Sequence, residues 1–557
     1  MVFIMNQNPD ANLTPDKTPP QGSHPQPGNP QPAMPVYIPR KDTKEYQAAR
    51  KTAQSSKGIA AALFAAGFSV LFIETVFLGE PAVSVFLLTL LYSGFILWYF
   101  HDKGKTLNRQ GVLLTLPITV ISLSFALFYN PSGLFLRAVT LLCLLCIQLV
   151  LLSDTGAGNP FTFDMLVRAA SAAISRPLSN LDLGFISLGT IKKSRGKKTA
   201  IAFKAAGGLL LSLPVALLLL TLFMQADAIF ESRVQQLLAA TNISFGRVFG
   251  DLFLGFLMAV YAAAVLIYAK SEGNNIPRRE GKRFLDPIGA ATFLGTVNVV
   301  MLLFVGFQFT YLFFGGANSL PDGLTYAEYA RRGFFELAAA SALCFGIAVL
   351  VMAFCRQRDG ALPLGVRMML LIMCGGNGMV LASAVKRMLL YVGVYGLSIR
   401  RALTLWLMAV IAVSLIWMLL RCLFARLPVQ RLIGSTVIAG VCLLSLCNLD
   451  RTVARYNVER YLADPLQSEI DVSYFHELSY AALPELAYLK EQLSADGVLS
   501  AEPTDDDKTA AQKAAWEGEL LFTVTTVMEH MQYRLDSRHF FYGYTFDTPA
   551  LRAVSGV

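Results

Sequence analysis

The sequence predicts an all-α fold, a polytopic transmembrane helical bundle of about 11 spans with a small helical extracytoplasmic C-terminal region. Two observations lead to this prediction. Apolar residues make up 54% of the 557 residues and charged residues only 15%, with a mean hydropathy of +0.51, which excludes an average soluble enzyme. The apolar residues also gather in nearly uncharged stretches of about 18 residues or more, long enough for a helix to cross about 30 Å of hydrocarbon.

The composition divides the chain into three regions. Residues 1–56 form a cytoplasmic, proline-rich N-terminal segment that we expect to be disordered, because ten of the 25 prolines lie before residue 40. Residues 57–448 form the transmembrane helical domain. Residues 449–557 form the C-terminal region, which is acidic, with 18 Asp and Glu against nine Lys and Arg, and helical at 474–492 and 511–535.

Hydropathy places the spans at residues 58–78, 82–100, 111–129, 134–152, 202–224, 249–269, 288–314, 333–355, 366–385, 402–420 and 432–448. Alternate loops then divide the basic residues unequally: 27 Lys and Arg lie on the side of the N-terminal flank and eight on the other side. Because Lys and Arg accumulate on the cytoplasmic side, the N-terminus is predicted to be cytoplasmic. The odd number of spans then makes the C-terminal region extracytoplasmic.

The loop before the fifth predicted span has a helical pattern of its own. In residues 161–174 the apolar positions recur at helical spacing, and they are Phe163, Leu166, Val167, Ala170 and Ile174. Arg168 and Arg176 fall on another face. This pattern predicts a helix that lies on the inner membrane surface.

The segment 326–337 carries charge into the eighth span. Glu328, Arg332 and Glu336 are four residues apart and form a ladder of alternating charge on a helix. Two interpretations remain open. The ladder is either an ion-pair network that satisfies Glu336 where it enters the membrane, or part of a polar pocket at the outer face.

Two further segments bring polar residues to the same predicted side. The segment 387–401 contains Arg387, Tyr391 and Tyr395, and four of the eight outward basic residues lie in it or directly before it. The segment after the last span contains Asp450 and Asn457. Cations gathered at an outer surface lower their energy beside carboxylates, so we expect one outer-face cluster. Its members are Glu328, Arg332, Glu336, Arg387, Tyr391, Tyr395, Asp450 and Asn457.

The ninth span contains Gly375, Gly376, Asn377 and Gly378 near its middle. One interpretation is close helix packing through small residues, with Asn377 bonded inside the bundle. The alternative is a midspan break, in which an unwound segment lines a ligand site. Under either interpretation we expect Asn377 to face the protein interior.

These segments resemble an uncharacterised bacterial membrane family, known as domain of unknown function four-one-seven-three. The similarity is carried by TYAEYARRGFFEL (325–337), RMLLYVGVYGLSIRR (387–401) and NLD followed by ARYNVERY (448–461). It covers about residues 200–490 and implies a multi-pass protein of the bacterial inner membrane. The family has no known activity to carry over to this chain.

The remaining patterns predict no cofactor, no metal ion and no catalytic residue. The five histidines lack metal-ligand spacing, and the glycine run at 375–378 lacks the ending of a phosphate-binding loop. The expected partners are membrane lipids and, through the acidic tail, a second protein, but no nucleic acid.

The leading functional hypothesis is a non-enzymatic protein that binds, transports or senses a small polar or lipidic ligand at its outer face. The alternatives are an enzyme for a lipid-linked substrate, with Glu328, Glu336 or Asp450 as acid or base, and a structural subunit of a membrane assembly.

Overall fold

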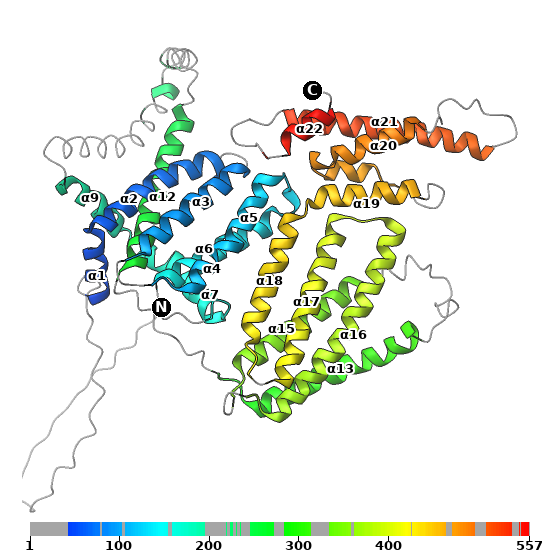
Figure 1. The fold of residues 1–557 in the computed structure, drawn as a ribbon, viewed down its shortest axis with the longest axis horizontal. Helices are drawn as coiled ribbons and strands as arrows, with labels where there is room; N and C mark the ends of the chain where they lie inside the picture. Colours follow the sequence, from blue (N-terminus) through cyan, green and yellow to red (C-terminus); the bar gives the residue numbers. More distant parts are fainter. Residues whose placement is uncertain are drawn as a thin grey trace, which may run out of the picture. The chain divides into compact units, whose positions relative to one another are not determined.

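The computed structural model describes residues 43–77, 81–102, 106–153, 159–194, 219, 223–226, 230, 234, 245–271, 283–313, 334–357, 361–424, 426–463, 470–495, 508–536, 545 and 547–555. In these residues every regular element is a helix, and one isolated parallel bridge joins Leu285 to Cys355 (Figure 1). This confirms the predicted all-α fold.

Ten described segments are long and apolar enough to cross a membrane: Ser56–Phe77, Val83–Phe100, Arg109–Leu127, Pro131–Ser153, Phe253–Lys270, Pro287–Phe307, Glu336–Phe354, Leu364–Tyr395, Ile399–Leu423 and Val429–Leu446. Each corresponds to a predicted span, so the protein is a multi-pass membrane protein. The other predicted span, 202–224, lies largely outside the described residues.

The first group of helices contains α1 (Lys44–Ala53), α2 (Ser56–Phe72), η2 (Ile73–Phe77), α3 (Val83–Phe100), α9 (Asp182–Ser194) and α12 (Phe245–Lys270). The prediction that residues 1–56 are disordered is wrong for residues 44–53, which form helix α1. Its residues Tyr46, Ala49 and Ala53 recur on one face and are buried in the core of this group, which offsets the cost of ordering them. Residues 1–42 lie outside the described part of the chain.

Lys57 fixes the end of α3 within this group. Its ammonium donates hydrogen bonds to the carbonyl oxygens of Trp98 and Tyr99, both at 3.0 Å, and of His101 at 3.2 Å. The last carbonyls of a helix have no hydrogen-bond partner inside the helix and carry partial negative charge. The Lys57 ammonium supplies both the missing donor and a compensating positive charge.

The second group contains α4 (Arg109–Leu113), α5 (Thr115–Leu127), η3 (Pro131–Gly133), α6 (Leu134–Ser153), α7 (Phe163–Ala170), η4 (Ser171–Ser175) and α8 (Arg176–Ser179). The third contains α13 (Pro287–Phe313), α15 (Phe334–Phe354), α16 (Leu364–Tyr395) and α17 (Ile399–Leu423) around one apolar core. Helix α18 (Val429–Leu446) contacts α5 and α6 of the second group and α17 of the third. It therefore joins the two groups, as Figure 1 shows.

The C-terminal region contains α19 (Leu449–Ala463), η5 (Ser473–Glu477), η6 (Tyr480–Ala482), α20 (Leu483–Ala495), α21 (Lys508–Asp536) and α22 (Thr548–Ser555) around a core of its own. Most of the two predicted tail helices is present as α20 and α21. The first part of the predicted 474–492 helix is instead two 3-10 turns, because Pro484 is tolerated only in the first turn of α20.

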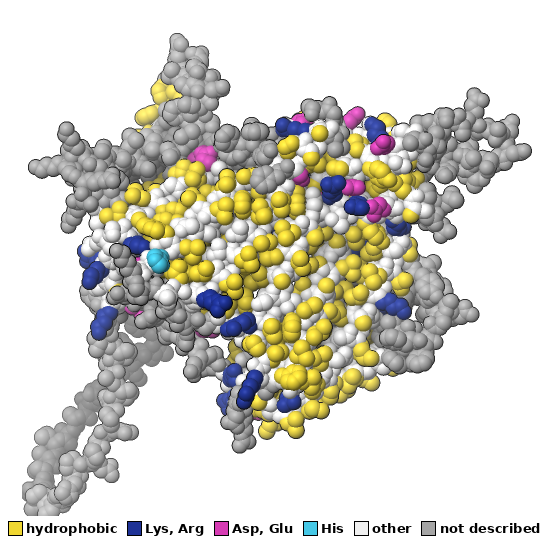
Figure 2. Space-filling view, in the orientation of Figure 1, with side chains coloured by type: hydrophobic (Ala, Val, Ile, Leu, Met, Phe, Trp, Pro, Cys, Tyr) yellow, Lys and Arg dark blue, Asp and Glu magenta, His cyan; other side chains and the backbone are white. Residues whose placement is uncertain are grey.

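The C-terminal region packs on one end of the spans, which we call the tail end. Asp547 N donates to Leu127 O at 3.2 Å, and Ile399 N donates to Tyr474 Oη at 2.8 Å. The opposite end, which contains Lys57, is called the basic end. On the face drawn in Figure 2, hydrophobic side chains cover much of the surface, while the charged side chains lie mainly toward its borders.

Candidate functional site

Helix α16 is longer than hydropathy predicts, and this determines where the site lies. It has 32 residues and continues ten residues past the predicted end at Val385. At 1.5 Å per residue it measures about 48 Å, against about 30 Å of hydrocarbon. Its last turns, which carry Tyr391 and Tyr395, therefore extend beyond the predicted span toward the tail end.

The turn after α16 is held by α19. Gly396 ends the helix with φ +73°, a left-handed conformation that favours glycine, and Ser398 caps the N-terminus of α17. The Asn457 side chain binds the intervening Leu397 twice, accepting from its N–H and donating to its carbonyl, both at 2.8 Å. Arg460 Nη2 donates to Val394 O at 2.7 Å. A Cβ on Gly396 would lie 2.5 Å from Asn457 Oδ1.

An arginine and two tyrosines gather at the same turn. The rings of Tyr391 and Tyr395 have centroids 4.9 Å apart, and the Arg401 guanidinium lies 4.2 Å from the Tyr391 ring centroid, a cation–π distance. Arg401 Nη1 also donates to Tyr395 O at 3.0 Å and to Gly396 O. The structure thus brings together three of the predicted site residues, Tyr391, Tyr395 and Asn457, beside the α16–α17 turn.

Asp450 has a different environment, two turns before Asn457 on α19. Its side chain is fully buried and accepts hydrogen bonds from Ser132 Oγ at 2.9 Å and from Ser479 N at 3.1 Å. The buried Arg137 interacts with it electrostatically and donates to Ser124 Oγ at 3.2 Å. These contacts tie the tail to the α5–α6 connection, so Asp450 holds the C-terminal region in place.

The other predicted members of the cluster lie on α15 and α16 or outside the described residues. Glu336 is exposed in the first turn of α15, and Arg387 is buried on α16. Glu328 and Arg332 lie outside the described residues. The proximity of Arg387 to these carboxylates stays a prediction.

The midspan glycine run is helical, which corrects the interpretation as a break. Helix α16 passes through Gly375, Gly376, Asn377 and Gly378 without interruption. A Cβ on Gly376 would lie 2.3 Å from the end of the Met301 side chain on α13, so glycine allows close packing there. Asn377 is 1% exposed and donates to Ser341 O on α15 at 3.1 Å, as expected for a side chain that faces the interior.

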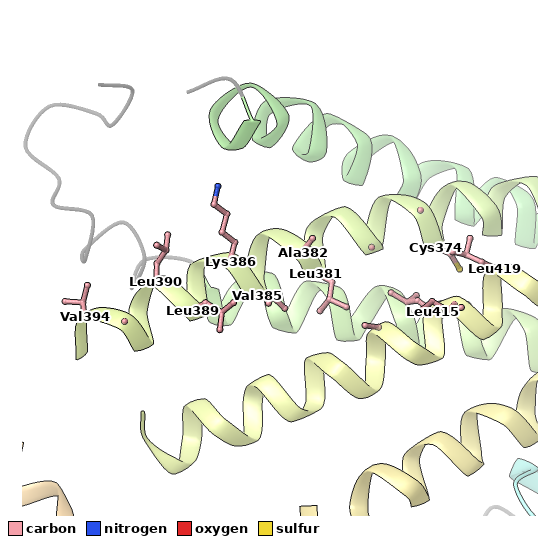
Figure 3. Close-up of a pocket in the computed structure, with 15 residues that line it drawn as sticks. Cys374, Leu381, Ala382, Val385, Lys386, Leu389, Leu390, Val394, Leu415 and Leu419 are labelled. Atoms are coloured by element: carbon pink, nitrogen blue, oxygen red, sulfur yellow. The ribbon is translucent and has the colours of Figure 1, made fainter. Parts of the chain in front are cut away.

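The opposite face of the same run lines a groove between α16 and α17. The groove has a volume of about 890 Å³ and extends along α16 from Cys374 to Val394, with Ala412, Leu415, Ile416 and Leu419 of α17 on its other wall. Among the described residues that line it, Lys386 alone is charged. In Figure 3 the Lys386 side chain extends away from those of Val385 and Leu389.

Several of these features were not predicted from the sequence. Ser132 and Ser479 carry no motif, and nothing in the sequence marks them as partners of Asp450. Gly396 had a readable signal, because a glycine directly after a helix and a serine two residues later mark a helix end and a new N-cap.

Comparison with protein families gives one match. Residues 115–489 match the family model described as Domain of unknown function (DUF4153). The resemblance was therefore right in pointing to a domain of unknown function, but domain four-one-seven-three was the wrong family. Neither a curated protein nor a solved structure matches the chain. Since the match covers more than half of the chain, this multi-pass membrane protein belongs to the DUF4153 family.

Proposed function

We propose that the protein binds a lipid, with an acyl chain in the groove between α16 and α17 and the polar head at the tail end. The observation that carries this proposal is the groove itself, because its lining is apolar apart from Lys386. Its volume of about 890 Å³ falls in the range of about 300–1,000 Å³ that is typical of small-ligand sites.

Glycines keep the groove open along its length. Gly375, Gly378 and Gly393 line it, and a Cβ built on any of the three would meet no other atom within 4 Å. A flexible hydrocarbon chain suits such a site, because it needs no hydrogen-bond partner from the walls.

The end of the groove supports a headgroup that carries a phosphate. Gly393 and Val394 lie in the last turn of α16, next to Tyr395 and the α16–α17 turn. Arg400 is exposed at the start of α17, and Arg401 follows it. Guanidinium groups bind phosphate oxygens well, and tyrosines are enriched at the headgroup level of membranes.

The orientation is part of the same proposal. The distribution of 27 against eight basic residues favours a cytoplasmic basic end and an extracytoplasmic tail end. The bound lipid would then belong to the outer leaflet of a bacterial inner membrane.

Lipid retention tests the proposal. We would purify wild type, Gly378→Leu and Gly346→Leu in mild detergent and count bound lipids by native mass spectrometry. A leucine at 378 fills the groove, whereas Gly346 on α15 also has open space beside it but lies outside the groove. We expect Gly378→Leu to lose bound lipid and Gly346→Leu to keep it. Equal lipid retention in all three proteins would refute the proposal.

A further inference from the structure

A second lipid-facing surface lies at the basic end, on the helical run formed by α7, η4 and α8. The run extends from Phe163 to Ser179 without a break and measures about 25 Å at 1.5 Å per residue. Thr162 caps its start, accepting a hydrogen bond from Met165 N at 3.2 Å. The run is therefore a formed helix, as the sequence pattern predicted.

One face of this run packs on the spans. Met165, Ala169 and Ala172 are buried in the core that also contains Leu114 of the third span and Leu151 of the fourth. Both span residues lie within about one turn of their span's basic end. The helix thus lies at the edge of the apolar layer and is not surrounded by the bundle.

The other face is apolar and exposed. Its large side chains are Phe163 (64% exposed), Leu166 (47%), Val167 (45%), Ile174 (58%) and Leu178 (57%). They recur at helical spacing and form one stripe. Arg168, the charged residue in the middle of α7, is 4% exposed and points away from this stripe.

The surroundings identify what covers the stripe. The Phe163 ring lies 6.0 Å from that of Phe354, the last residue of the α15 span, so the stripe begins at a membrane-crossing helix. Leu113 and Leu116, close to Leu114 of the same core, are each 67% exposed, so the third span also presents apolar side chains to its surroundings at this end. Continuity with surfaces that face acyl chains points to lipid as the occupant.

We infer that the stripe of Phe163, Leu166, Val167, Ile174 and Leu178 inserts into the leaflet at the basic end as an in-plane lipid-binding surface. Its partners are acyl chains just below the headgroups, the position of amphipathic interfacial helices. This inference does not depend on the groove, which lies in other helices.

Spin labels in nanodiscs test this inference. The exposed cysteines Cys143 and Cys447 are first replaced by serine, and labels are then placed by Leu166→Cys, Ile174→Cys and the control Ser175→Cys. Ser175 is an exposed polar residue of the same run. Oxygen concentrates in the acyl region, and the nickel complex NiEDDA stays in water. At 166 and 174 we expect collisions with oxygen to exceed those with NiEDDA, and at 175 the reverse.

Two outcomes overturn the inference. Dominant collisions with NiEDDA at 166 and 174 place the stripe in water, and low collision rates with both reagents show that protein covers it. A second measurement needs no cysteine: in nanodiscs that contain lipids brominated near the headgroup, Leu166→Trp should lose more fluorescence than wild type, whose four tryptophans give the background. A loss no greater than that of wild type in a folded Leu166→Trp protein contradicts lipid contact.

Discussion

The side chain of Asn457 binds both backbone groups of Leu397, with Oδ1 2.8 Å from its nitrogen and Nδ2 2.8 Å from its oxygen. These two residues are 60 positions apart, and together they attach the C-terminal region to the α16–α17 turn. The attachment lies beside the end of the proposed lipid groove.

Asn457→Ala should destabilise the protein by about 2 kcal/mol, because a half-buried N–H and carbonyl lose their partners. Thermal unfolding in detergent measures the loss. The control is Arg455→Ala, which breaks the exposed pair with Glu459 and should change stability by less than about 1 kcal/mol. Equal effects of the two substitutions would show that the attachment contributes nothing.

Gly396→Ala should cost about 1–3 kcal/mol from the backbone alone, because φ +73° with ψ −179° is a conformation that is essentially confined to glycine. The added Cβ also displaces Asn457 Oδ1, so Leu397 loses part of its attachment. Gly393→Ala, in the last turn of the same helix with open space beside it, is the matched control. It should leave the melting temperature unchanged or raise it, since alanine is the better helix former. A Gly396→Ala protein as stable as wild type would contradict the assigned conformation.

Asp450→Asn should loosen the tail. The amide can still accept from Ser132, but its nitrogen cannot accept from Ser479 N, and Arg137 loses a nearby negative charge. We expect a loss of about 2 kcal/mol, as for hydrogen bonds to charged groups. Hydrogen exchange should accelerate in α19 and α20 and stay unchanged in α13. Asp536→Asn, at an exposed position near the end of α21, should leave all three rates as they are.

Neighbouring glycines should respond differently to the same substitution. Gly376→Leu collides with Met301 and should destabilise by about 1–3 kcal/mol, as overpacking does. Gly375→Leu points into the groove and should leave the fold intact while it displaces lipid. Both proteins should still insert into the membrane. A normally stable Gly376→Leu protein would show that this face of α16 meets lipid instead of α13.

Cysteine labelling tests the proposed orientation. Ser494→Cys, at an exposed position in α20, should react with an impermeant maleimide on intact cells. Ser194→Cys, at the end of α9, should react only after permeabilisation. The reverse pattern would invert the proposed topology.

The spans were predictable because the hydrocarbon layer imposes a minimum length of apolar residues. The end of α16 was not predictable, because Lys386 and Arg387 lower the hydropathy while the helix continues to Tyr395. Helix α1 was missed for a related reason: its polar residues resemble those of the proline-rich segment, and its order depends on tertiary packing against α2, α9 and α12.

Several residues of the candidate site could be predicted from the sequence, but their contact partners could not. Tyr391, Tyr395 and Asn457 were selected from local sequence, and the structure places them at one turn. The partners of Asp450 were out of reach, because Ser132 lies 318 residues away and a lone serine carries no signal of its tertiary contact. The charge pattern predicted that Asp450 would lie beside outward basic residues. In the structure it is buried and accepts hydrogen bonds from a serine hydroxyl and a backbone N–H.

The position of α18 and α19 also affects how the protein is made. The first and third groups of helices are complete within residues 44–270 and 287–423, but α18 and α19, which tie the α5–α6 region to α17, come later in the chain. During synthesis each group can insert and fold before this connection exists. In a nascent chain that stops before residue 429, the contacts that α18 and α19 make with these groups are still missing, so this part of the packing forms last.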